Sequence, residues 1–158
     1  MVKFEGYEFV DGGVCAAEGF TAAGVIAGIK AGNTTKRDLA MIFCAERCKA
    51  AALYTTNKVK GAPIYVTKKH LEDGCAQAVI VNSGNANTCN ENGIEIAEQM
   101  CELTAEALDI DADDVLVGST GADKGAHTHP RKGAFLQEEQ RGMRSNNDHR
   151  HPQEGDRR

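Results

Sequence analysis

The chain has 158 residues, of which 41% are hydrophobic, so it is long enough for one ordinary domain with a packed core and short for two. Aromatic residues make up only 5% and Trp is absent, so we expect a core of Ala, Val, Ile and Leu. A formal net charge of -5 argues against nucleic acid or an anionic membrane as partner. No apolar run reaches the roughly 20 residues of a membrane span, and the first residues lack a secretory signal pattern, so we expect a cytoplasmic protein.

Apolar segments in the first half of the chain predict strands. Gly19–Ile29 is rich in Gly, Ala and β-branched residues and is interpreted as a pair of strands. Leu39–Ala45 and Ala50–Thr55 are interpreted as neighbouring strands, with Glu46–Lys49 as the turn between them. Pro63–Leu71 fits either a strand or a helix.

The second half predicts a strand, a helix and a strand. Ala76–Val81 is a continuous apolar run, typical of a buried strand, and Val115–Val117 is a second one. Glu91–Leu108 has helical periodicity, and Thr88 followed by Glu91 fits a capping box at its start. Its apolar residues fall on two adjacent stripes, namely Ile94, Ala97, Cys101 and Leu108, then Ile96, Met100, Leu103 and Ala107.

The chain changes composition after residue 121. Residues 1–121 hold 10 Lys and Arg against 17 Asp and Glu, a net charge of -7, whereas residues 122–158 hold 8 against 6, a net charge of +2. The second segment has few large apolar residues, so it cannot bury enough surface to offset the entropy lost on ordering. We therefore expect an α/β domain at 1–121 and a disordered polar tail at 122–158.

The cysteines and histidines give no convincing metal site. Without a secretion signal, the six cysteines are expected to be free thiols. Cys44 and Cys48 are four apart on a segment interpreted as strand and turn, so buried apolar roles are favoured over zinc. The acidic run at 109–114 lacks the Gly and the final Glu of a calcium loop. Four histidines lie in the tail, where they would be adventitious ligands at most: His127, His129, His149 and His151.

Two polar loops follow buried strands. The first, at 82–87 (NSGNAN), precedes the predicted helix, so it can be an anion site at a helix N-terminus or simply a tight turn that caps the helix. It has neither the P-loop nor the dinucleotide-binding pattern. The second is Gly118-Ser119-Thr120-Gly121, where a Thr hydroxyl and a Gly N–H at a strand end can both point at a developing negative charge. A plain Gly/Ser turn is the alternative.

Several segments together resemble one family, the bifunctional ornithine acetyltransferase/N-acetylglutamate synthase family. The matching segments, in order over about 110 residues, are Gly12-Gly13-Val14, Gly19-Phe20, Ala23-Gly24-Val25, Gly28-Ile29-Lys30, Asp38-Leu39-Ala40, Thr55 to Lys60 with Ala62-Pro63, Val81 to Asn87, and Ser119-Thr120-Gly121. The NSGNAN loop and the Ser-Thr-Gly turn are the most specific of these.

The resemblance implies a layered α/β sandwich of the N-terminal-nucleophile type, present here only in part. It implies acetyl transfer from N-acetylornithine to glutamate in arginine biosynthesis, by a ping-pong reaction through an acetylated Thr, with acetyl-CoA as a further co-substrate in some members. That Thr becomes the first residue of a β-chain when the precursor cleaves itself, and two α- and two β-chains assemble. It also implies that Thr120 and Gly121 form the oxyanion hole, with no resident cofactor or metal.

The resemblance ends after Gly121. The family cleaves itself at an Ala-Thr bond, and this sequence contains no Ala-Thr dipeptide. A shifted reading frame after codon 121 would produce such a change. We therefore expect an incomplete α-chain without activity of its own, and the alternative is a non-catalytic binding or structural module that keeps the front of the fold. A self-sufficient enzyme with a Cys nucleophile is disfavoured, because no Cys has a recognisable nucleophile context.

Overall fold

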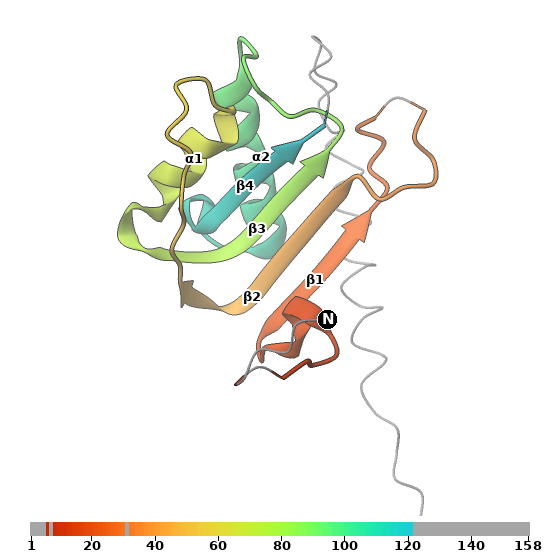
Figure 1. The fold of residues 1–158 in the computed structure, drawn as a ribbon, viewed down its shortest axis with the longest axis vertical. Coiled ribbons are helices and arrows are strands. Elements are labelled where there is room, and N and C mark those ends of the chain that lie inside the picture. The colour runs from red at the N-terminus through yellow and green to blue at the C-terminus, as the bar shows by residue number, and fades with distance from the viewer. Residues whose placement is uncertain (1–5, 7, 31, 122–158) are drawn as a thin grey trace, which may run out of the picture.

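The computed structural model describes residue 6 and residues 8–30 and 32–121. They form a mixed α/β layer, a four-stranded sheet in the order β1-β2-β3-β4 with helices (Figure 1), as the resemblance implied. The predictions for the tail at 122–158, including its four histidines, lie outside the described residues. The strands are β1 (Phe20–Val25), β2 (Leu39–Lys49), β3 (Cys75–Ser83) and β4 (Val115–Thr120), the α-helices are α1 (Ala62–His70) and α2 (Gly93–Leu108), and single 3-10 turns are η1 (Gly13–Ala16), η2 (Leu71–Asp73) and η3 (Ala112–Asp114).

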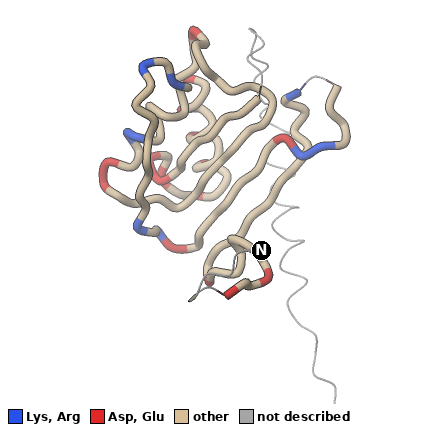
Figure 2. Tube along the Cα trace, viewed as in Figure 1, with Lys and Arg blue, Asp and Glu red and all other residues tan. Residues whose placement is uncertain are grey.

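The sheet has one parallel and two antiparallel pairs. β2 is antiparallel to both β1 and β3, and β4 is parallel to β3. Figure 2 shows that charged residues lie mainly in turns and at the end of β2, and β1, β3 and β4 contain none. The strands predicted at Leu39–Ala45, Ala76–Val81 and Val115–Val117 are confirmed. Their continuous apolar runs are stabilised by removal of apolar surface from water, which favours buried strands.

Helix α2 supplies most of the cover for one sheet face. Ile96, Ala97, Met100, Cys101 and Ala105 are buried, and all but Ile96 join the core cluster that contains the centres of β3 and β4. The helix itself is confirmed, but the stripe that included Ile94 is partly wrong, since Ile94 is 48% exposed. The buried face combines members of both predicted stripes with Thr104 and Ala105, which belong to neither.

Helix α1 covers the free edge of β4, and it resolves the ambiguity at Pro63–Leu71. The Thr67 hydroxyl donates to the Val117 carbonyl at 3.0 Å and accepts from the Val117 N–H at 3.3 Å. His70 Nδ1 lies 2.8 Å from the carbonyl oxygen of Val115. These side chains replace the strand that an edge would otherwise recruit. Pro63, in the first turn, lacks only an N–H that no helical carbonyl would accept.

The predicted strand pair at Gly19–Ile29 is wrong, because only β1 forms there. Beyond Val25 the chain leaves the sheet, and the N–H groups of Ala27 and Ile29 donate to the carboxylate of Asp38 instead of a strand. The Asp38 carboxylate thus accepts hydrogen bonds that the carbonyl groups of a neighbouring strand would otherwise accept.

The predicted turn at Glu46–Lys49 and strand at Ala50–Thr55 are also wrong. β2 continues to Lys49 through a bulge, because its register with β3 shifts between Phe43 and Cys48. Lys49 then pairs with Cys75, the first residue of β3, so no partner strand remains for the residues that follow. The segment from residue 50 is outside the sheet.

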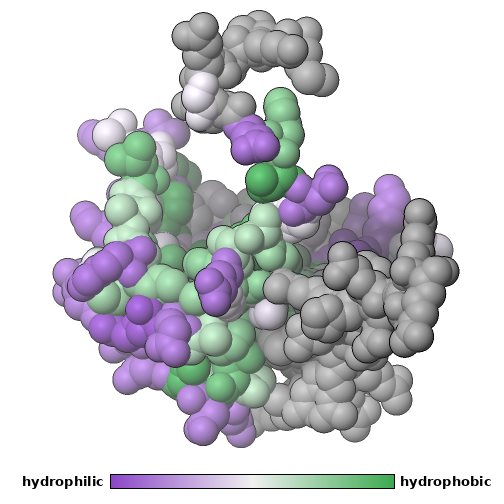
Figure 3. Space-filling model, turned by 90° about the horizontal axis from the view of Figure 1, so that it is seen from below, coloured by the Kyte–Doolittle hydropathy of each residue, from purple (hydrophilic) through white to green (hydrophobic). Residues whose placement is uncertain are grey.

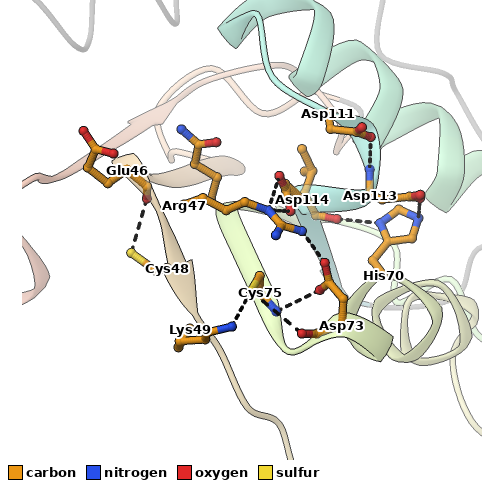
Figure 4. A network of polar contacts seen from close by, with 12 residues as sticks. Glu46, Arg47, Cys48, Lys49, His70, Asp73, Cys75, Asp111, Asp113 and Asp114 are labelled. Atoms are coloured by element: carbon orange, nitrogen blue, oxygen red, sulfur yellow. Dashed lines mark hydrogen bonds and ion pairs between the residues drawn. The ribbon is translucent and has the colours of Figure 1, made fainter.

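An ion-pair network holds the far end of β2 (Figure 4). Arg47 Nε donates to both carboxylate oxygens of Asp114, at 2.7 and 2.8 Å, and Arg47 Nη2 contacts Asp73. The hydrogen bonds that Arg47 donates to the carboxylates of Asp73 and Asp114 raise the pKa of Arg47 above its usual range, and the guanidinium lowers the pKa of Asp73. The network ties β2 to η2 and η3, across the start of the β3–β4 pair.

Several large apolar side chains stay exposed, and Figure 3 shows apolar surface between hydrophilic groups on the side seen from below. The most exposed are Phe9, Val10, Leu53 and Val59. None of the helices in the described part of the chain is both long and apolar enough to cross a membrane.

Two isoleucines of α2 test this packing. Ile96 is 8% exposed and Ile94 is 48% exposed, so replacing each by Ala changes helix propensity equally but removes buried methyl groups only at Ile96. We expect Ile96→Ala to cost about 2–4 kcal/mol in urea unfolding and Ile94→Ala within about 0.5 kcal/mol of zero. Equal losses would contradict the orientation of α2.

Candidate active-site edge

The parallel pairing of β3 and β4 brings the two polar loops together. Asn82 and Ser83 of β3 lie beside Ser119 and Thr120 of β4 in the register. One residue further, the Gly84 N–H donates to the Thr120 carbonyl at 2.8 Å. Carboxyl ends of parallel strands share one edge, and ligands of α/β sheets bind outside that edge. We call residues 82–87 and 118–121 the carboxyl edge.

Gly121 packs directly on the backbone of the first loop. A Cβ at Gly121 would lie 2.7 Å from the Gly84 carbonyl carbon and 2.9 Å from the Asn85 nitrogen. Its φ of 126° also belongs to the region that glycine tolerates best. The Gly at this position is therefore required by a close backbone approach.

Thr120 and Gly121, the predicted oxyanion pair, lie at the end of β4, and both are exposed. Thr120 shares a sheet face with its neighbour Ser83, while its backbone carbonyl is fixed by Gly84. The backbone of this turn is thus held at two points while the Thr120 side chain stays accessible. A hydroxyl and an adjacent backbone N–H on a held backbone are suitable donors for a developing oxyanion.

Asn87 organises the rest of the NSGNAN loop. It is 2% exposed with a left-handed φ of 52°. Its N–H donates to Asn85 Oδ1 at 2.7 Å, its Nδ2 donates to the Gly93 carbonyl at 2.8 Å, and its carbonyl accepts from the Ala62 N–H at 2.9 Å. One side chain and its backbone thus link the loop to the starts of both α1 and α2.

The capping box predicted at Thr88 and Glu91 is wrong. Helix α2 starts at Gly93 with Asn92 at the N-cap, and Asn92 makes no side-chain capping bond. Gly93 is needed there because a Cβ would lie 2.7 Å from Asn87 Oδ1. The loop therefore lies before the helix without capping it, and its residues Gly84 and Asn85 contact Gly121.

Asn82 is buried at the start of the same loop. Its Nδ2 donates to the Asn85 carbonyl at 3.1 Å, which closes the turn around Gly84. Its Oδ1 is buried and has no hydrogen-bond partner among the described residues. A buried acceptor without a donor lowers the free energy of unfolding, so this turn is less stable than one in which Asn82 Oδ1 accepts a hydrogen bond.

Asp38 is a further residue of this edge, to which the sequence analysis gave no role. It is 4% exposed, and its carboxylate accepts from Ala27 N at 2.6 Å, Ile29 N at 2.9 Å and Asn33 Nδ2 at 2.9 Å. Its own carbonyl accepts from the Ser83 N–H at 2.8 Å. An Asp directly before a buried strand, with Gly and Asn in the preceding loop, is the signal that could have indicated a carboxylate clamp.

The clamp positions a third segment against the carboxyl edge. A Cβ at Gly84 would lie 2.9 Å from Ile29 Cγ2 and 3.3 Å from Lys30 N. The Ile29–Lys30 backbone is the part that Asp38 holds. Burial opposes ionisation of Asp38, but the hydrogen bonds from Asn33 and from the backbone N–H groups together hold its pKa below the usual value.

A separate hollow of about 420 Å³ lies at the start of α2. Its lining includes Lys60, Tyr65 and Glu91, with the Lys60 ammonium 5.2 Å from the centre of the Tyr65 ring. Thr120 and Gly121 do not line it. Within the described ranges, no group of three or more His, Cys, Asp or Glu side chains is placed to hold a metal ion.

Gly121→Ala tests the close approach. The added methyl group would meet backbone atoms, so we expect a loss on the order of 1–3 kcal/mol and faster hydrogen exchange at the Gly84 N–H. Gly118→Ala is the matched control, because its Cβ would meet only Val81 side-chain atoms, the nearest at 3.3 Å. Unchanged exchange at Gly84 in Gly121→Ala would refute the contact.

Asp38→Asn tests the clamp. An amide puts N–H groups where the carboxylate accepts, so we expect a loss of about 1–3 kcal/mol at neutral pH. Because the folded pKa of Asp38 is lowered, its ionic contribution is present above the unfolded pKa of about 4 and is lost as pH falls through the folded value. Urea unfolding at neutral and acidic pH should therefore show the difference shrinking in acid. Asp11→Asn, at an exposed position, is the control and should change little.

Comparison with known proteins shows which family this chain resembles. The ArgJ family model matches residues 21–125, more than half of the chain. The chain is 46% identical over 115 residues to the arginine biosynthesis bifunctional protein ArgJ of Caldanaerobacter subterraneus subsp. tengcongensis, covering 72% of this chain and 28% of that protein. The corresponding protein of Symbiobacterium thermophilum is 47% identical over 115 residues, with 72% and 29% covered. The chain thus spans less than a third of the length of these curated relatives.

Solved structures agree. The arginine biosynthesis bifunctional protein ArgJ of Bacillus halodurans superposes with a TM-score of 0.72 at 36% identity, covering 78% of this chain and 65% of that one. Ornithine acetyltransferase of Mycobacterium tuberculosis, complexed with ornithine, gives a TM-score of 0.68 at 40% identity, covering 77% and 65%. The resemblance drawn from the sequence is confirmed, and the chain belongs to the ArgJ family of ornithine acetyltransferases.

Proposed function

We propose that this chain supplies the oxyanion-binding edge of an ornithine acetyltransferase that moves an acetyl group from N-acetylornithine to glutamate in arginine biosynthesis. The observation that carries the proposal is the held turn at Thr120 and Gly121, fixed by the Gly84 hydrogen bond and by backbone packing. Family membership supports it, and so does the relative from Mycobacterium tuberculosis, which is described with ornithine bound.

The chemistry explains why such an edge is needed. Acetyl transfer passes through a tetrahedral intermediate in which the carbonyl oxygen becomes negative. The Thr120 hydroxyl and the Gly121 N–H would donate hydrogen bonds to that oxygen. Donors that are fixed before the reaction need no reorganisation when the charge appears, so they lower the barrier. The Asp38 clamp and the Gly84 contact act one step further out, by holding the backbone of the donors.

The nucleophile must come from elsewhere. In the family's ping-pong scheme, a Thr released at an Ala-Thr bond attacks the acetyl group, and this sequence contains no such bond. We therefore propose that the edge works together with a β-chain that carries the Thr, in an assembly of two α- and two β-chains. Acetyl-CoA is a second donor that such an assembly could use to acetylate glutamate.

A chimeric enzyme tests the role of the edge. Residues 1–121 would replace the matching segment of the Caldanaerobacter relative, which is 46% identical. Thr120→Ala in this chimera should lower kcat about 10²–10³-fold with a small change in KM, as expected for a donor used in the transition state. Thr120→Ser keeps a hydroxyl and should retain most activity.

The same chimera separates the two interpretations of the chain. A non-catalytic module would give either an inactive chimera or one in which Thr120→Ala has no effect, provided that both variants fold as judged by circular dichroism. Normal kcat in Thr120→Ala would reject the oxyanion role while leaving family membership intact.

The unmodified 158-residue chain is expected to lack turnover with N-acetylornithine and glutamate, because it has no Thr that an Ala-Thr cleavage could release. The measurement is formation of N-acetylglutamate by mass spectrometry, with the intact relative as positive control. Product formed by the purified chain alone would overturn the assignment of the nucleophile to another chain.

A further inference from the structure

The bulge in β2 brings two thiols into contact. Cys44 and Cys48 are four residues apart, and in a regular strand their Cα atoms would be about 13 Å apart. Here their sulfur atoms are 3.2 Å apart. The register shift between Phe43 and Cys48 is what folds the strand back enough to allow this contact. Both thiols are reduced, as are all six cysteines.

The two thiols differ in accessibility. Cys44 is 5% exposed and packs beside the backbone of Gly19, where an added Cβ would lie 3.6 Å from its sulfur. Cys48 is half-buried, and its thiol lies 3.3 Å from the Glu46 carbonyl, as Figure 4 shows. An oxidant from solution therefore reaches Cys48 first, and Cys44 is the nearest thiol to resolve the product.

We propose that Cys44 and Cys48 are a modification site that closes to an intrachain disulfide when the chain meets a low-molecular-weight disulfide such as oxidised glutathione. The thiolate of Cys48 attacks one sulfur of the oxidant, and one glutathione thiolate leaves. The thiolate of Cys44 then attacks the Cys48 sulfur and releases the second glutathione. Two thiols are oxidised to one disulfide, the oxidant is reduced to two thiols, and the two cysteine protons pass to the departing glutathiones.

The bulge also means that forming the disulfide requires little movement of the backbone. The sulfur atoms must approach by only about 1 Å to reach bonding distance. Residues 44–47 face a single residue of β3, Gln77, so they lie outside the regular β2–β3 ladder. Cys44 still pairs with Phe20 of β1, so the backbone that can adjust without breaking a pair is that of Glu46 and Arg47. The closed ring is short and lies far along the chain from Thr120, so the proposal is independent of the proposed acetyl transfer.

Peptide mapping of the full chain tests the site. The chain is incubated with oxidised glutathione at mildly alkaline pH, because the hydrogen bond with Cys44 raises the pKa of Cys48. Remaining thiols are blocked with N-ethylmaleimide before trypsin digestion. Trypsin cleaves after Arg37, Arg47 and Lys49, so the disulfide would join peptide 38–47 to the dipeptide 48–49. This linked pair is expected as the main oxidised product, and dithiothreitol should abolish it.

Three single variants test the order of events. Cys44→Ser should stop at a glutathione adduct on Cys48, and Cys48→Ser should leave Cys44 unmodified. Cys89→Ser removes an exposed thiol elsewhere and should leave the linked pair unchanged. If a variant fails to fold, peptide mapping of the unaltered chain still tests the proposal. A stable Cys48 adduct in that chain, or Cys48 joined mainly to Cys89 or to a second chain, would overturn the proposal.

Discussion

The parallel pairing of β3 with β4 is the constraint on which the rest of this structure depends. A parallel pair needs a crossover, which α2 supplies, and the crossover must leave β3 and return to the start of β4. Both carboxyl ends then meet at one edge, so two loops that are more than 30 residues apart come into backbone contact. The buried centre of the pair, Ile80 beside Val117, fixes the register that sets this contact.

Around that pair, three departures from regular structure each have a local cause. The chain leaves β1 after Val25 because the Asp38 carboxylate offers better acceptors than a strand edge. β2 bulges after Phe43, and the Arg47 guanidinium then reaches the carboxylate of Asp114. Asn87 adopts a left-handed backbone because its polar groups satisfy the starts of both helices. Hydrogen bonds and ion pairs of polar side chains, rather than the strand propensity of the residues, thus account for these departures from regular structure.

These causes explain how far the sequence could be interpreted. The apolar runs of β3 and β4 and the period of α2 were predicted correctly, since burial of apolar surface dominates there. The turn at Glu46–Lys49 was wrong because a charged segment looks like a turn unless its distant partner, Asp114, is known. The strand at Ala50–Thr55 was wrong because a strand needs a partner, and the apolar pattern does not reveal where the partner begins. The oxyanion role of Thr120 and Gly121 was predicted from family resemblance and stays a prediction. The role of Asp38 was missed, because its position before a buried strand is only a weak local signal and its partners Ala27 and Ile29 lie 9 to 11 residues away.

The contacts that hold the carboxyl edge together do not involve the nucleophile with which the edge is proposed to act. Within the described residues, the Thr120–Gly121 turn is held by the Gly84 N–H and by the Gly84–Asn85 backbone, and Gly84 in turn packs against the segment that Asp38 holds. None of them involves a Thr at a cleavage site. If these residues bind an oxyanion as proposed, the contacts that hold them do not depend on the nucleophile. The proposed donors, the Thr120 hydroxyl and the Gly121 N–H, can therefore be positioned by the contacts within this segment, and the proposed attack by a Thr nucleophile is a separate requirement.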